Sequence, residues 1–148
     1  MKHLRLGDGV THEAVSAGGV PCIWLVPQDD PAGRVLLYLH GGGFVFGLTA
    51  QHMGLGAYLA RKMASRVLMV DYRLAPEHPF PAALDDCAAA YRWLLEQGVP
   101  AGNITVAGDS AGGNLTLTLL MKLRDEGDPL PAAAACLSPV ADLSRVND

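Results

Sequence analysis

The sequence has few of the features that mark metal sites, disulfide frameworks or nucleic-acid surfaces. Its cysteines, Cys22, Cys87 and Cys136, are odd in number and widely spaced, so neither a disulfide framework nor a zinc site is indicated. We expect them to be buried apolar side chains. Lysine and arginine form no cluster and the formal net charge is -4, which argues against nucleic acid or an anionic membrane as a partner. No metal and no organic cofactor is implied.

Long hydrophobic runs are also absent. No apolar stretch approaches the roughly 20 residues of a membrane-spanning helix, and residues 7–9 (Gly-Asp-Gly) stand where a secretory signal would be apolar. We therefore expect no membrane span and a cytoplasmic, reducing location. What is present is an ordinary globular composition: half of the 148 residues are hydrophobic, enough for the core of one domain.

Short apolar segments alternate with stretches of helical length. The expected strands are 34–39, 66–72, 104–107 and 132–137, and the expected helices are 51–63, 81–97 and 111 to about 124. Near-continuous apolar strands suit a sheet that is covered on both faces, and this alternation predicts a parallel sheet with right-handed crossovers. Upstream, 11–17 and 21–26 are predicted to be two edge strands, joined as a hairpin through Gly18-Gly19.

Two of the expected helices have an apolar stripe at helical spacing. In 81–97 the stripe is Leu84, Cys87, Ala88, Tyr91 and Leu95, with Asp85, Asp86 and Arg92 pointing elsewhere. In the following helix the stripe is Leu115, Leu119 and Leu123, and Gly127 ends the helix. These stripes are expected to pack on the sheet.

The run Gly108-Asp109-Ser110-Ala111-Gly112 lies between an expected strand and an expected helix. A sharp turn in that context lifts a serine hydroxyl above the sheet, as acyl transfer requires, and holds the serine at a positive φ. The glycines leave room for such a turn. The alternative is a glycine-rich turn whose serine only caps the helix.

Three consecutive glycines follow another strand, in His40-Gly41-Gly42-Gly43. Glycines at a strand's carboxyl end free backbone N–H groups to face a ligand. The developing oxyanion of an acyl transfer needs such donors, and we expect them from Gly42, Gly43 and Ala111. A flexible loop or a phosphate cradle is the alternative, but GxGxxG spacing and a P-loop lysine are lacking. His40 is expected to hold the loop rather than to act as a base.

Three ordered blocks resemble the hormone-sensitive-lipase-like esterases, a branch of the α/β hydrolases. They are 40–44 (HGGGF), 71–83 (DYRLAPEHPFPAA) and 108–114 (GDSAGGN), within a similarity that runs from about 34 to 143. The resemblance implies an α/β three-layer sandwich with a mostly parallel sheet, a carboxylic ester hydrolase activity, Ser110 as nucleophile and the oxyanion hole named above. The middle block, with Asp71, Glu77 and His78, is expected to be scaffold. Asp109 is expected to form the turn or cap the helix.

The resemblance breaks after Ser110. The family places its catalytic acid and then its histidine beyond the nucleophile, whereas all five histidines here precede it: His3, His12, His40, His52 and His78. Asp142 is expected to be a turn residue. We therefore interpret 1–148 as a partial α/β-hydrolase catalytic domain, truncated before the last strands, with the acid and base not in this chain. Segment 132–137 would then be an exposed edge that another chain or a homo-oligomer could complete.

The functional hypothesis is hydrolysis of small apolar esters through an acyl-enzyme on Ser110. The apolar loop Phe44-Val45-Phe46 is the candidate wall of the acyl pocket. The alternatives are a ligand-binding protein on the same scaffold and a catalytically inactive fragment.

Overall fold

One mixed sheet organises the computed structural model, which describes residues 9–30 and 33–144. Within these residues the strands are β1 (Val10–Ala17), β2 (Val20–Pro27), β3 (Val35–Leu39), β4 (Arg66–Val70), β5 (Ile104–Asp109) and β6 (Ala133–Leu137), in the order β1-β2-β4-β3-β5-β6. The helices are α1 (Ala50–Met63), α2 (Ala82–Glu96), α3 (Ala111–Glu126) and a short 3-10 helix, η1 (Ala101–Asn103). Residues 7–9, which argue against a secretory signal, fall mostly outside the described part.

The four strands predicted to be parallel are parallel: β3 pairs with β4 on one side and β5 on the other, and β6 pairs with β5. The β1–β2 hairpin is also present. The prediction that both of its strands lie at an edge is wrong, because β2 pairs with β4 in antiparallel register and only β1 is terminal. Cys22 and Leu25 of β2 are buried, as expected for a strand covered on both faces.

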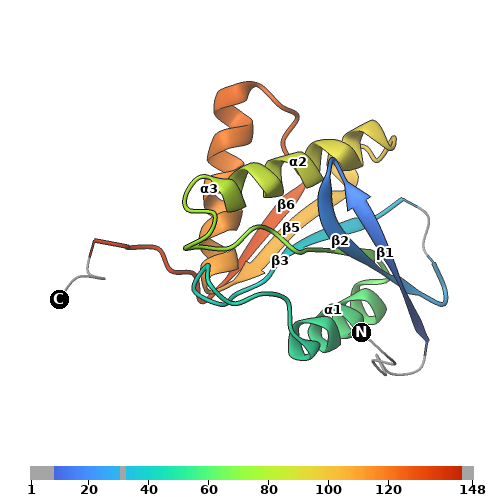
Figure 1. The fold of residues 1–148 in the computed structure, drawn as a ribbon. Helices are drawn as coiled ribbons and strands as arrows, with labels where there is room; N and C mark the ends of the chain where they lie inside the picture. Colours follow the sequence, from blue (N-terminus) through green and yellow to red (C-terminus); the bar gives the residue numbers. More distant parts are fainter. Residues whose placement is uncertain (1–8, 31–32, 145–148) are drawn as a thin grey trace.

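Two hydrophobic cores lie on opposite faces of the sheet. On one face α1 contributes Met53, Ala57 and Ala60 to the core. On the other face α2 and α3 pack together, and their buried leucines include Leu94 and Leu119. Figure 1 shows α1 on one side of the strands and α2 with α3 on the other. This helix–sheet–helix arrangement confirms the predicted three-layer α/β sandwich.

The apolar stripes are confirmed with two corrections. In α2 the fully buried leucine at the end of the stripe is Leu94, while the predicted Leu95 is only half-buried. In α3, Leu115, Leu119 and Leu123 are buried, and Gly127 ends the helix at φ 78°. In α2 the prediction that Asp86 points away from the buried stripe is wrong, because its carboxylate is buried. It accepts hydrogen bonds from the backbone N–H of Arg73 at 2.9 Å and from the Arg73 guanidinium at 2.8–3.0 Å. A charged group can be buried at this position because its partner compensates for the lost water.

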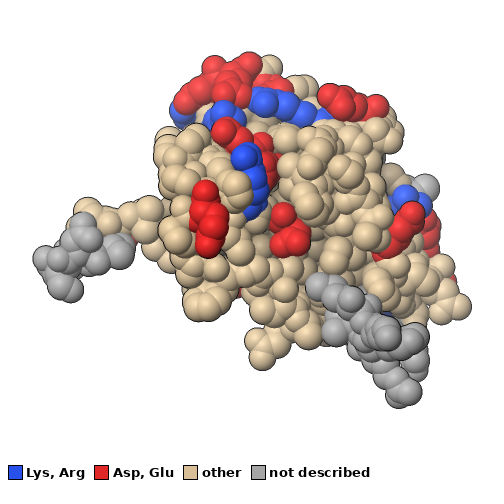
Figure 2. Space-filling model, viewed as in Figure 1, with Lys and Arg blue, Asp and Glu red and all other residues tan. Residues whose placement is uncertain are grey.

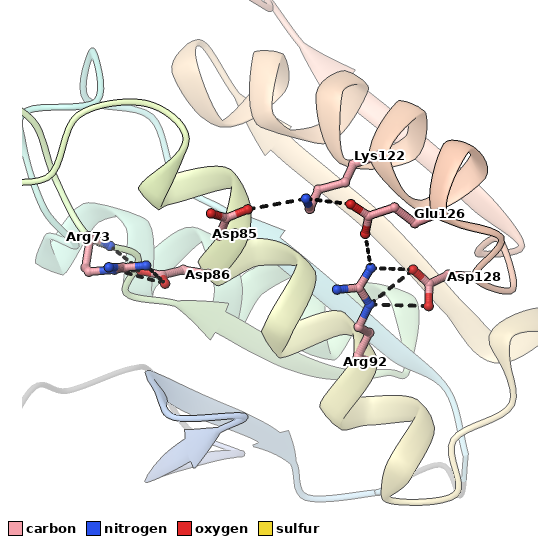
Figure 3. Close-up of polar contacts among 7 residues, drawn as sticks. All are labelled: Arg73, Asp85, Asp86, Arg92, Lys122, Glu126 and Asp128. Carbon is pink, nitrogen blue, oxygen red and sulfur yellow. Dashed lines mark hydrogen bonds and ion pairs between the residues drawn. The ribbon is translucent and has the colours of Figure 1, made fainter.

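Ion pairs join the outer faces of α2 and α3. Arg92 binds Asp128 and Glu126, while Lys122 bridges Glu126 and Asp85 (Figure 3). Figure 2 shows the charged side chains gathered along the upper edge of the molecule, over these two helices. Such exposed pairs add little stability individually. This surface is therefore a solvated face and not a candidate site.

Strand β6 is the far edge of the sheet, and most of its side chains are exposed. The prediction of buried cysteines is confirmed for Cys22 and Cys87 but wrong for Cys136, which is half-buried because β6 is an edge strand with β5 on one side only. Burial raises the pKa of the Cys22 thiol to about 12. No helix within the described residues is long and apolar enough to cross a membrane.

Candidate active site

Two turns meet at the carboxyl edge of the sheet because their parent strands are neighbours. In the β3–β5 ladder Leu39 is opposite Gly108, so the loop after β3 and the turn after β5 begin side by side. A Cβ atom on Gly112 would lie 1.9 Å from the Leu39 carbonyl oxygen, and one on Gly108 would lie 2.6 Å from it. The turns therefore pack backbone against backbone, which explains both glycines of the motif.

Ser110 occupies the junction between β5 and α3 with φ 51° and ψ -115°. This positive φ, predicted from the motif, is a strained conformation for a residue with a side chain. The backbone holds it: the Ser110 N–H donates to the Leu137 carbonyl at 2.9 Å, and its own carbonyl accepts from Asn114 and Val140, each at 3.1 Å. The side chain makes no capping hydrogen bond, so the alternative of a simple helix-capping serine is not what the structure contains.

The glycine loop is fixed one peptide at a time. In the peptide between His40 and Gly41, the carbonyl accepts from the Tyr72 hydroxyl at 2.6 Å, and the N–H donates to Asp109 Oδ1 at 3.0 Å. In the next peptide, the Gly41 carbonyl lies 2.7 Å from His40 Nδ1. Because a carbonyl only accepts, Nδ1 carries the proton.

The third peptide of the loop is fixed as well. The Gly42 carbonyl accepts from the backbone N–H groups of Val45 at 3.1 Å and Phe46 at 2.9 Å. In a trans peptide the N–H points away from the carbonyl of the preceding residue. The Gly41 carbonyl contact therefore sets the direction of the Gly42 N–H, and the Gly42 carbonyl contacts set that of the Gly43 N–H. Within residues 9–30 and 33–144, neither amide has an acceptor, and the Ala111 amide at the start of α3 has none either. Free amides of this kind can bind an anionic oxygen.

The His40 ring is buried and stacks on Tyr72 with 4.2 Å between ring centroids. Burial lowers its pKa, so the ring is held neutral. Its Nδ1 contact agrees with the expected loop-holding histidine, whereas Nε2 is buried without a partner among the described residues. The His40 ring therefore holds the glycine loop through its hydrogen bond to Gly41.

The expectation for Asp109 is wrong. Its carboxylate does not form the turn or cap the helix but reaches across to the neighbouring strand, where Oδ1 accepts from the Tyr38 hydroxyl at 2.8 Å and from the Gly41 N–H. Tyr38 and Tyr72 are thus contributors to the site that the sequence reasoning missed. Tyr38 lies in an apolar strand and Tyr72 just after one, so in the sequence both look like ordinary core residues.

The remaining candidates lie apart from these contacts. Asp71 continues β4 with a backbone hydrogen bond to Pro21, and Glu77 is exposed. Asp142 accepts from the Ser144 N–H at 2.8 Å, as expected for a turn residue. No group of three or more metal-ligating side chains occurs in the described part of the chain.

A cavity of about 370 Å³ opens between the two turns and the segment that precedes α2. Its walls are mostly apolar: Phe44, Arg73, Ala75, His78, Pro79, Phe80, Pro81, Ala83, Leu84, Asn114, Leu115, Thr118 and Leu143. Of the loop proposed as the acyl wall, only Phe44 lines it, while Val45 and Phe46 are exposed. The cavity adjoins the glycine loop through Phe44 and the first turn of α3 through Asn114.

Residues 36–148, which include all of these features, match a family model described as alpha/beta hydrolase fold. The chain belongs to the α/β-hydrolase family. Within this family it is similar to a crystal structure of an esterase from the bacterial hormone-sensitive lipase family, with a TM-score of 0.89 and 47% identity over 92% of this chain and 46% of that chain. The resemblance to hormone-sensitive-lipase-like esterases is confirmed.

Two curated α/β-hydrolase relatives have names that state an activity. An acetyl-hydrolase of Streptomyces hygroscopicus is 49% identical over 132 residues, covering 89% of this chain and 44% of the relative. A carboxylesterase/phospholipase, LipF, of Mycobacterium tuberculosis is 47% identical over 120 residues, covering 81% and 32%. The chain therefore spans less than half the length of these relatives.

Proposed function

We propose that the protein is a carboxylic ester hydrolase with Ser110 as its nucleophile. The observation that carries the proposal is the pairing of a strained, uncapped serine with three backbone amides that have no acceptor in the described structure, those of Gly42, Gly43 and Ala111. The family membership and the names of the relatives support the same reaction class.

In the proposed reaction Ser110 Oγ loses its proton to a general base and forms a bond to the ester carbonyl carbon, whose π electrons move to oxygen. The three amides donate to that oxyanion, and the N-terminus of α3 adds a favourable field. Collapse expels the alcohol, which takes up a proton, and leaves an acyl group on Ser110. Water then loses a proton to the same base and adds to the acyl carbon, after which the bond to Ser110 Oγ breaks, the proton returns to Oγ and the acid is released. Because the loop peptides are fixed before substrate binds, little reorganisation opposes the reaction.

Attack by Ser110 requires a general base. Within the described residues no side chain is hydrogen-bonded to the Ser110 hydroxyl, and the histidine of the glycine loop, His40, is hydrogen-bonded to the Gly41 carbonyl. We assign the base and its acid partner to residues outside this sequence. The greater length of the relatives supports that assignment.

The cavity supports small apolar esters as substrates. A volume of about 370 Å³ suits a short acyl or alkyl chain, and its walls carry mainly apolar side chains. The name of the acetyl-hydrolase relative points in the same direction. We propose that the substrate side chain packs between Phe44 and Leu115.

The test uses the full-length protein and a series of nitrophenyl esters of increasing acyl length. We expect turnover to be highest for the short chains and to fall by at least about 10³-fold in Ser110→Ala. Ser16→Ala, an exposed serine on β1, is the matched control and should retain wild-type activity. Hydrolysis by Ser110→Ala at the wild-type rate would refute the assigned nucleophile. Failure of the wild-type protein to hydrolyse any ester, with saturable ester binding, would identify a binding protein instead.

A further inference from the structure

We propose that Asp109 and Tyr38 are positioning residues that set the glycine loop in place against Ser110. The inference rests on the proposed function, because it concerns the same reaction. Asp109 immediately precedes Ser110, and its Oδ1 atom accepts from the Gly41 N–H at 3.0 Å and the Tyr38 hydroxyl at 2.8 Å. One carboxylate oxygen thus connects the nucleophile turn to the first glycine of the loop.

The phenol end of this connection is fixed. Tyr38 lies on β3, with Met69 of β4 and Ala107 of β5 opposite it, and its side chain is fully buried. Its hydroxyl donates to Asp109 at the carboxyl end of β5. Burial and the neighbouring Asp109 raise its pKa, which keeps the hydroxyl protonated as a donor.

The loop end of the connection is equally close. A Cβ atom on Gly41 would lie 2.2 Å from Asp109 Oδ2, so the carboxylate occupies the space that any side chain at position 41 would need. The carboxylate is held on one side by a phenol and on the other by backbone. A movement of Asp109 would therefore carry Gly41 with it.

The consequence for catalysis follows from the order of the peptides. Asp109 fixes the N–H side of the His40–Gly41 peptide, and the Tyr72 hydroxyl fixes its carbonyl side. The orientation of this peptide determines the position and direction of the next peptide, which carries the Gly42 N–H. Loss of the carboxylate leaves the turn intact but releases the loop at Gly41, so the oxyanion donors lose their alignment. Phe44, the loop residue that lines the cavity, is held separately, because its carbonyl accepts from the Ala75 N–H at 2.8 Å. The effect should thus fall on kcat and not on KM.

The experiment compares three variants in the full-length protein. Asp109→Ala is expected to lower kcat by about 10- to 100-fold, the cost of a misplaced donor, with KM within about two-fold of wild type. Asp109→Asn keeps an acceptor oxygen and should restore most of the lost kcat. Tyr38→Phe, which removes one hydrogen bond to the carboxylate and leaves the Gly41 N–H contact in place, should lower kcat by about 3- to 10-fold. It also tests the idea if Asp109→Ala does not fold.

Two controls separate positioning from general stability. Asp128→Ala removes a carboxylate that pairs with Arg92 far from the turns, and should change thermal stability little and leave kcat unchanged (Figure 3). Amide hydrogen exchange at Gly41 should accelerate in Asp109→Ala and not in Asp128→Ala.

The outcomes distinguish this inference from the proposed function. If Ser110→Ala abolishes hydrolysis but Asp109→Ala and Tyr38→Phe keep wild-type kcat, the positioning role is wrong and the nucleophile stands. If the wild-type protein has no esterase activity, the proposed function fails, and unchanged exchange at Gly41 in Asp109→Ala would separately refute the contact itself.

Discussion

The close approach of the two turns predicts a graded response to adding one methyl group at three helical glycines. Gly112 lies in the first turn of α3, where a Cβ atom would meet the Leu39 carbonyl oxygen at 1.9 Å. An ordinary contact needs 3.4 Å, so the atoms must separate by about 1.5 Å. Leu39 cannot yield, because β3 is hydrogen-bonded on both sides. We expect Gly112→Ala to lower the unfolding free energy by at least about 3 kcal/mol.

The two other glycines, in α1, provide matched controls. At Gly54 a Cβ atom meets nothing within 4 Å, so Gly54→Ala should stabilise the protein by roughly 0.5–1 kcal/mol through helix propensity alone. At Gly56 it meets the ends of the Leu25 and Met69 side chains at 2.6 and 2.7 Å, which can rotate away. The net loss for Gly56→Ala should be about 1 kcal/mol.

Urea unfolding of the full-length protein, followed by tryptophan fluorescence, measures all three glycine variants. The expected order of stability is Gly54→Ala, wild type, Gly56→Ala and then Gly112→Ala. A Gly112→Ala variant as stable as wild type would refute the backbone-to-backbone packing of the turns.

Two further predictions concern buried polar groups. Burial lowers the pKa of His40 below its ordinary 6.5, so the unfolded chain binds that proton more tightly, and the unfolding free energy should fall as pH decreases through 6.5. His40→Asn keeps a donor for the loop but cannot titrate, and urea titrations should show a weaker pH dependence; an unchanged slope would contradict this. Arg73→Ala leaves the buried Asp86 carboxylate without its guanidinium partner and should lower the urea midpoint more than Arg66→Ala, which breaks an exposed pair with Asp30. Equal midpoints would contradict the importance of burial.

The sequence alone could predict the layers because each element has its own periodicity. The apolar strands and the leucine stripe of α3 depend only on residues a few positions apart. The turn at Ser110 and the glycine loop could be found because tight turns restrict residue type locally. Asp86 could not be placed in this way, since its burial depends on Arg73 from a different segment.

The contacts of Asp109 could not be predicted for the same reason. Its partners Tyr38 and Gly41 are 71 and 68 positions away in the chain and become neighbours only through the register that sets Leu39 beside Gly108. No local pattern contains that register. The position of Cys136 likewise follows from the place of β6 at the sheet edge, which strand order determines and periodicity does not.

Covalent labelling tests the central claim most directly, because it asks whether Ser110 is an activated nucleophile beside oxyanion donors. The full-length protein is treated with a fluorophosphonate, and its intact mass and peptide map are recorded. We predict a single adduct on Ser110, no adduct in Ser110→Ala, and normal labelling of Ser16→Ala. An adduct on another residue, or an unlabelled Ser110 in a protein that still hydrolyses esters, would contradict the account.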